Sequence, residues 1–330
     1  MKKTIYLASS GELKRKQNTL FFETEKGRKY IPVQDTQEIM VFGEVSINKK
    51  LLDFISQNGI IMHFFNYYGY YSGTFYPREH LNSGHMILKQ AEHYMDQAKR
   101  MELAKAFVEG AIYNILKVLQ YYSRRDVELA DIIESIETLE KKIGSAEKTD
   151  ALMGLEGNVR EYYYKAFDRI TNDPEFAFES RTRRPPRNRI NSLISFGNSL
   201  VYTAALSEIY KTHLDPRIGF LHTANFRRFS LNLDAAEIFK PIMADRLIFT
   251  LINKKMLSPK DFQDGTAGVA LKEKGRNVYL EQFDQRMKTT IKHPSLNREV
   301  SYRTLIRLEL HKIEKHILGE AKYDPFVASW

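Results

Sequence analysis

Short apolar and aromatic runs dominate the first 80 residues, and turn-forming residues such as Gly11, Gly27 and Gly59 separate them. The runs cover residues 4–7, 13–23, 29–33, 38–42 and 60–65, and a further hairpin is expected over residues 66–76. Runs of this length and spacing are typical of a small antiparallel β-sandwich. Residues 51–58 interrupt them with apolar side chains on one helical face, and Gly59 can end that helix in the left-handed conformation.

From residue 81 onward the apolar positions recur at helical spacing instead. This period predicts a long helix over residues 86–122, further helices over 152–170, 190–214, 235–252 and 302–318, and a mobile loop at 265–275. The sequence therefore predicts an α+β protein of two domains. Residues 1–80 form a small N-terminal antiparallel β-sandwich, and residues 81–330 form a larger, essentially all-α C-terminal domain.

Composition narrows the class of protein. The 330 residues include no Cys, which excludes disulfides, thiolate nucleophiles and cysteine-ligated metal clusters. No apolar run approaches the roughly 20 residues of a membrane span, so we expect an intracellular protein with no membrane partner. The 50 Lys and Arg outnumber the 41 Asp and Glu, and the resulting charge of +9 favours a polyanionic partner such as nucleic acid.

Common catalytic motifs are missing. The sequence has no phosphate-binding G-x-x-x-x-G-K-[ST] loop, no G-x-G-x-x-G and no H-E-x-x-H, which argues against nucleotide hydrolysis and zincin-type proteolysis. His63, His93 and His311 lie in strand or helix patterns without acidic partners at ligand spacing, and we interpret them as structural.

Two acidic segments could carry chemistry. Glu156 lies between Gly154 and Gly157, where missing side chains would let a ligand come close, although a first-turn Glu that favours the helix dipole is the simpler explanation. Asp234, Glu237 and Lys240 share one helix face downstream of His222. An N-cap at Asp234 with Glu237 at the third helical position would explain the two acids, but not His222 or Lys240.

A third segment is strongly basic. Residues 181–189 contain five arginines and no acid, which suits phosphate binding, whereas the alternative is a solvated basic loop. The five are Arg181, Arg183, Arg184, Arg187 and Arg189. Together with the acidic segments, this stripe suggests Mg²⁺ or Mn²⁺ held by oxygen and nitrogen ligands, and hence phosphodiester chemistry.

The order and spacing of these segments resemble a known family. Leu-Met-Gly-Leu-Glu-Gly at 152–157, Arg-Arg-Pro-Pro at 183–186 and Gly-Phe-Leu-His at 219–222, followed by Asp234, Glu237 and Lys240, are similar to the CRISPR adaptation integrase family, CRISPR-associated protein one. The resemblance implies an N-terminal β-sandwich, a helical catalytic domain, and a cytoplasmic prokaryotic enzyme. It also implies a homodimer that assembles with CRISPR-associated protein two around double-stranded prespacer DNA.

The resemblance assigns roles by position. Glu156, His222 and Glu237 match the metal ligands of the family, Asp234 matches a neighbouring acid, and Lys240 matches a basic position that faces DNA. The implied activity is metal-dependent DNA cleavage and integration, in which a prespacer 3′-hydroxyl attacks CRISPR repeat DNA. Two alternatives stay open: a non-catalytic basic DNA-binding scaffold, and a structure-selective nuclease for branched repair intermediates.

Overall fold

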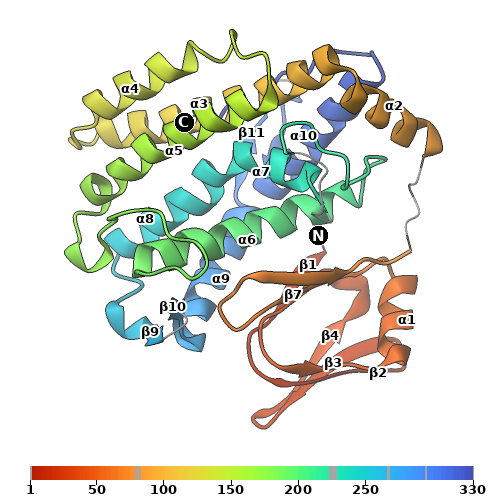
Figure 1. Cartoon of the computed structure of the whole chain (residues 1–330). Coiled ribbons are helices and arrows are strands. Elements are labelled where there is room, and N and C mark those ends of the chain that lie inside the picture. The colour runs from red at the N-terminus through yellow and green to blue at the C-terminus, as the bar shows by residue number, and fades with distance from the viewer. Residues whose placement is uncertain are drawn as a thin grey trace.

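The computed structural model describes residues 2–78, 81, 83–222, 229–265, 268–293 and 296–329. It has an α+β fold with a strand-rich N-terminal part and a larger helical part, as predicted (Figure 1). The predicted domain boundary lies between residues 80 and 81, and residue 80 is outside the described residues. Within the described ranges, no helix is long and apolar enough to cross a membrane.

The N-terminal part contains two four-stranded sheets. The first has the order β1-β5-β7-β8 and the second the order β4-β3-β2-β6. The strands are β1 (Lys3–Leu7), β2 (Gly11–Lys16), β3 (Thr19–Thr24), β4 (Gly27–Pro32), β5 (Thr36–Val41), β6 (Val45–Ser46), β7 (Ile61–Phe65) and β8 (Tyr71–Phe75), with helix α1 (Lys49–Gln57) after β6. Asn48 caps α1, and Gly59 follows the helix with φ +63°, as expected.

The expected antiparallel arrangement is wrong for the first sheet. Among the described residues, β1, β5 and β7 run parallel, and β7 pairs antiparallel with β8. In the second sheet, β2 and β6 also pair in parallel, whereas β2, β3 and β4 are antiparallel as predicted. The helix α1 carries the chain back between β5 and β7, a crossover that parallel neighbours require. The single run predicted over residues 13–23 is two strands, because Gln17 turns the chain with φ 54°.

Helices form most of the remaining chain. They are α2 (Gly84–Met95), α3 (Gln97–Ser123), α4 (Ala130–Glu140), α5 (Thr149–Thr171), α6 (Arg189–Ile209), α7 (Leu231–Lys240), α8 (Arg246–Asn253), α9 (Glu273–Lys288) and α10 (Tyr302–Ile317). The predicted long helix over 86–122 is two helices, because Asp96 leaves the helical conformation and caps α3 through its side chain. A turn of π-helix, Pro241–Asp245, joins α7 to α8.

The helical part is not entirely α. Two hairpins, β9 (Phe262–Gly265) with β10 (Gly268–Leu271) and β11 (Thr290–Lys292) with β12 (Glu299–Ser301), interrupt it. The loop predicted at 265–275 contains β10 and the start of α9, and residues 266 and 267 lie outside those described. These strands are three or four residues long, too short for a period of two to be recognised in the sequence.

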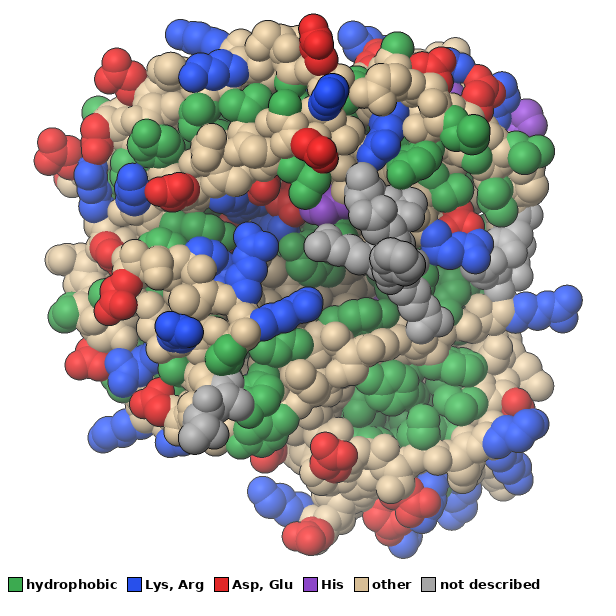
Figure 2. Space-filling model, viewed as in Figure 1, with side chains coloured by type: hydrophobic (Ala, Val, Ile, Leu, Met, Phe, Trp, Pro, Cys, Tyr) green, Lys and Arg blue, Asp and Glu red, His purple; other side chains and the backbone are tan. Residues whose placement is uncertain are grey.

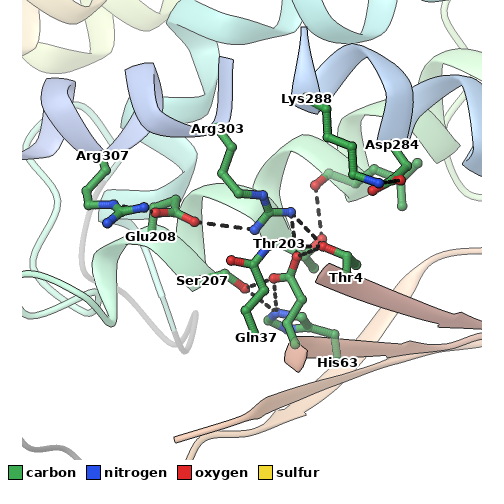
Figure 3. A network of polar contacts seen from close by, with 12 residues as sticks. Thr4, Gln37, His63, Thr203, Ser207, Glu208, Asp284, Lys288, Arg303 and Arg307 are labelled. Carbon is green, nitrogen blue, oxygen red and sulfur yellow. Dashed lines mark hydrogen bonds and ion pairs between the residues drawn. The ribbon is translucent and has the colours of Figure 1, made fainter. Parts of the chain in front are cut away.

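A buried polar network joins the first sheet to the helices (Figure 3). The Arg303 guanidinium on α10 donates to Glu38 Oε1 on β5 at 2.5 Å and to Glu208 Oε1 on α6 at 3.3 Å. His63 on β7 lies 2.8 Å from Ser207 Oγ, which donates to the other oxygen of Glu38. The network therefore fixes the strands against α6 and α10, and it confirms the structural interpretation of His63.

Candidate active site

Asp234 anchors the segment that carries His222. Its carboxylate accepts hydrogen bonds from the backbone N–H groups of Phe220, Leu221 and His222 at 2.5, 3.1 and 2.9 Å. It also lies 2.7 Å from Nδ1 of His222, so the imidazole presents Nε2 outward. Residues 223–228, which follow His222 in the sequence, lie outside the described residues.

The capping interpretation of Asp234 is therefore wrong. Helix α7 begins at Leu231 with Ser230 at its N-cap, and Asp234 is the fourth helical residue. Its carboxylate instead binds the turn before the helix. That turn comes very close, because a Cβ on Gly219 would lie 2.8 Å from the Asp234 carboxylate.

Glu156 and Glu237 meet at one guanidinium. Arg160 Nε donates to Glu156 Oε1 at 3.0 Å, and Arg160 Nη2 donates to Glu237 Oε2 at 2.9 Å. Glu156 is the eighth residue of α5, so it is not a first-turn glutamate. A Cβ at Gly154 or Gly157 would contact nothing within 4 Å among the described residues, which leaves open space beside Glu156.

Lys240 pairs with the second oxygen of Glu237. Its Nζ also lies 4.6 Å from the ring centre of Tyr202 on α6. Burial opposes the charged form of Glu237, yet the charges of Lys240 and Arg160 outweigh burial and lower its pKa to about 2. The same pairing overcomes burial at Lys240 and raises its pKa. Both groups are therefore charged at neutral pH.

The π-turn adds a third acid, Asp245, behind these groups. Asp245 follows Glu237 by eight residues. In an uninterrupted α-helix two such residues would lie about 80° apart around the axis, and the wider π-turn between them reduces that angle. Asp245 Oδ2 thus comes within 3.6 Å of Arg160 Nη1 on the side that carries Glu237. Burial, only partly offset by Arg160, raises the pKa of Asp245 to about 6.

His222 is the remaining predicted ligand. Burial opposes its charged form, but the hydrogen bond to Asp234 and the charges of Asp234 and Glu237 outweigh burial and raise its pKa. Nε2 makes no hydrogen bond within the described part of the chain, so in the neutral form of the ring this nitrogen can coordinate a metal ion.

The donor chemistry fits a hard divalent cation. Two carboxylates and one imidazole nitrogen are oxygen and nitrogen ligands of the kind that Mg²⁺ and Mn²⁺ accept. Among the residues that the structure describes, no three His, Asp or Glu side chains converge closely enough to hold a metal ion as they stand. The reason is visible in the contacts: Arg160 and Lys240 occupy carboxylate oxygens that such an ion would take.

The arginine run divides into two groups. Arg181 is held to α6 by Asn191 and Ser195 at 2.9 and 3.0 Å, and Arg189 pairs with Glu175 at 2.7 Å. The exposed members are Arg183, Arg184 and Arg187, and none pairs with a carboxylate within the described ranges. Figure 2 shows basic side chains around a hollow in the middle of one face, beside a His and acidic side chains.

Sequence reasoning assigned no role to two residues of the site. Arg160 follows Glu156 by four residues, a spacing that predicts a pair on one helix face. Asp245 gave no such signal, because its position depends on the π-turn.

Comparison with known proteins identifies the family. The family model described as CRISPR associated protein Cas1 matches residues 5–285. The chain is 60% identical, over the full length of both proteins, to the CRISPR-associated endonuclease Cas1 2 of Thermodesulfovibrio yellowstonii. The structure of a Cas1 protein from Thermotoga maritima matches with a TM-score of 0.90 at 51% identity, covering 97% of this chain and 98% of that one.

Two more distant structures share the fold. A casposase bound to integration product matches with a TM-score of 0.89 at 20% identity, covering 98% of this chain and 93% of that one. A Cas6-RT-Cas1–Cas2 complex matches with a TM-score of 0.88 at 17% identity, covering all of this chain and 36% of that one.

Proposed function

Because the chain belongs to the CRISPR-associated Cas1 family, we propose that it is a metal-dependent DNA endonuclease and integrase that inserts prespacer DNA into a CRISPR array. The observation that carries the proposal is the meeting of Glu156 and Glu237 at Arg160, beside a histidine oriented by Asp234. A non-catalytic scaffold has no need for this combination of buried charges, which is expensive to maintain without a function.

In the proposed reaction the 3′-hydroxyl oxygen of a prespacer strand attacks a phosphorus atom of the repeat DNA. The attacking hydroxyl gives up its proton to solvent as a new oxygen–phosphorus bond forms, the bond from phosphorus to the 3′-oxygen of the repeat strand breaks, and that oxygen takes up a proton and leaves as a hydroxyl. Glu156, His222 Nε2 and Glu237 would hold Mg²⁺ or Mn²⁺. When bound, the ion would polarise the phosphoryl oxygen and stabilise the leaving oxygen.

The protein groups have separate tasks in this proposal. Asp234 keeps His222 oriented through Nδ1. Arg160 sets the separation of the two glutamates. Lys240, when an ion replaces it at Glu237, can turn toward a DNA phosphate, and Arg183, Arg184 and Arg187 hold the backbone further away.

The proposal extends to partners. It includes a homodimer that assembles with a CRISPR-associated protein two around double-stranded prespacer DNA. Support comes from the two distant structures of the same fold, of which one is a complex with Cas2 and the other is bound to an integration product.

The test is strand transfer of prespacer ends into plasmids with and without a CRISPR repeat. We expect Mn²⁺-dependent joining that prefers the repeat, loss of joining with EDTA, and loss in Glu156→Gln but not in the matched control Glu161→Gln, which is exposed on the same helix. Equal joining by Glu156→Gln would overturn the proposed site. Cleavage of branched DNA without any preference for the repeat would favour the repair nuclease.

A further inference from the structure

Arg276 on α9 is a buried cation whose charge is only partly balanced: Glu273, three residues earlier on the same helix, attracts it without forming an ion pair. The residue is 8% exposed, and its side chain makes no hydrogen bond or ion pair with any residue the structure describes. Its Nε is completely buried, and the nearest ring centre, that of Phe42, is 5.9 Å from its guanidinium carbon.

This situation contrasts with the other buried arginines. Arg160 and Arg303 each contact at least two carboxylates. A guanidinium withdrawn from water without such compensation destabilises the fold, and an apolar side chain of similar length would serve the core better. Burial accordingly lowers the pKa of Arg276. The attraction of Glu273 offsets burial only in part, so an anionic group of another molecule would complete the compensation.

The surroundings of Arg276 restrict how that molecule approaches. The guanidinium lies in a crevice between the β7–β8 turn, α6, β10 and α9. Its lining residues are Tyr67, Tyr68, Gly69, Ser192, Phe196 and Leu271. The crevice is too narrow to enclose a water molecule, so a nucleobase does not fit inside it. A ligand of Arg276 would therefore approach from the mouth of the crevice.

The walls of the crevice also carry the exposed arginines. The Tyr70 hydroxyl, next to the β7–β8 turn, donates to the carbonyl oxygen of Arg183 at 2.5 Å. On the other side, Val269 N of β10 donates to Pro186 O at 2.9 Å, and a Cβ on Gly268 would lie 2.4 Å from Pro185. The run that contains Arg183, Arg184 and Arg187 is thus packed between two walls of the crevice. A row of cations favours a polyanion over a single carboxylate.

We propose that Arg276 binds a backbone phosphate of DNA that lies across the mouth of this crevice, beside Arg183, Arg184 and Arg187. The inference rests on the proposed function, since it assumes a DNA ligand. Tyr67, 60% exposed at the same mouth, offers a surface for a sugar or base next to that phosphate.

The test is Arg276→Met, studied by chemical denaturation and by duplex DNA binding over a range of salt concentrations. Because the substitution removes a buried cation that Glu273 compensates only in part, we expect the DNA-free protein to be at least as resistant to urea as the parent. Affinity for DNA should fall about threefold to tenfold, and the slope of log K against log salt should decrease by roughly 0.9, the effect of one lost phosphate contact.

Arg169→Met is the matched control, because it removes the same charge from an arginine already paired with Asp131 at 2.6 Å. It should leave the salt slope unchanged. Arg276→Gln serves as a second variant and should show the same loss of slope.

Three results would overturn the proposal. One is a salt slope for Arg276→Met equal to that of the parent. Another is lower stability of both variants without DNA, which would make Arg276 structural. The third is retained DNA affinity with lost binding of the Cas2 protein, which would assign the crevice to an acidic protein. If the parent protein itself binds no DNA, the proposed function is wrong. That result differs from DNA binding by the parent with an unchanged salt slope in Arg276→Met, which would contradict the role of Arg276 alone.

Discussion

Four hydrogen bonds converge on the carboxylate of Asp234, three from backbone N–H groups and one involving the His222 ring. This side chain is completely buried, and no water is needed to satisfy it. The residue therefore has two tasks that cannot be separated by removing it, since it holds both the backbone of the turn and the imidazole.

Asp234→Asn is expected to weaken both tasks. An amide offers one acceptor oxygen where the carboxylate offers two, so buried donors lose partners, at a cost of roughly 1–3 kcal/mol in the free energy of unfolding. Urea denaturation and Mn²⁺ titration calorimetry should show lower stability and weaker binding. Asp150→Asn, exposed in the first turn of α5, is the control. Parent-like values for both measurements would contradict the anchoring role.

Arg160 provides a second prediction at the same scale. Arg160→Met leaves Glu156, Glu237 and Asp245 without their shared guanidinium and should destabilise the protein by about 3–5 kcal/mol. A divalent cation can replace the lost charge, so Mn²⁺ should raise the melting temperature of the variant more than that of the parent. An equal Mn²⁺ response in thermal unfolding would argue against an ion site between these glutamates.

Residue spacing predicted part of this site and missed part of it. Glu237 and Lys240 share a helix face and form the ion pair that their spacing allows. The same spacing suggested a capping box at Asp234, because nothing in the sequence shows that α7 begins at Leu231. The contacts from Asp234 to residues 220–222 cross a stretch with no regular period, so they depend on tertiary structure.

Among the elements, α6 comes very close to α9 at one point, Gly197. A Cβ on Gly197 would lie 2.2 Å from the hydroxyl oxygen of Tyr279 and 3.0 Å from the Cβ of Ala244 in the π-turn. Tyr279 is fully buried and its hydroxyl has no hydrogen-bond partner in the described structure, so the ring cannot move aside into solvent. Gly197 thus permits the approach of α9 and the π-turn.

Gly197→Ala should destabilise the protein by roughly 1–3 kcal/mol through overpacking. Tyr279→Phe removes the clashing oxygen and should restore part of that loss when the two changes are combined. Gly154→Ala on α5 is the contrasting case: open space surrounds it, and a helical Ala should stabilise by up to about 1 kcal/mol. Urea denaturation measures the effect of each substitution, and a double-mutant cycle measures the coupling of Gly197→Ala and Tyr279→Phe. Strict additivity of these two changes would contradict the assigned contact.

Element by element, long amphipathic helices were the most predictable feature. The predicted ranges 302–318 and 152–170 correspond closely to α10 (Tyr302–Ile317) and α5 (Thr149–Thr171). The break at Asp96 was not predicted, because the apolar period of α2 continues almost in phase into α3. Strand direction was not predictable either, since a period of two is the same for parallel and antiparallel neighbours.

For the whole molecule, the network around Glu38 and His63 predicts how stability depends on pH. Burial, which outweighs the attraction of Glu38, lowers the pKa of His63 to about 4, and Arg303 overcomes burial to lower the pKa of Glu38 to about 2. The unfolded chain therefore binds protons that the folded chain does not. The contribution of His63 to stability should be complete above pH about 6.5 and should be lost as the pH falls toward 4, whereas Asp245, whose pKa burial raises to about 6, contributes in the opposite direction over the same range.

The contribution of His63 over this window is roughly 3 kcal/mol. Urea denaturation at several pH values between 7 and 4 should show the stability of the parent falling relative to that of His63→Gln, since Asp245 contributes equally to both proteins. His85→Gln, which alters an exposed histidine on α2, is the matched control. Profiles that are parallel for the parent and His63→Gln would show that another group is responsible.

The first sheet belongs to two cores at once. Ile39, Val41 and Met62 pack within the sandwich, whereas Met40, Phe42 and Phe65 belong to the large apolar cluster of the helices. A fragment that ends after β8 would expose that second face to water, together with Glu38 and His63 stripped of their partners on α6 and α10. The strand-rich part should therefore not fold as an independent unit. In chimeras between relatives, the strands should fold only when α6 and α10 come from the same parent.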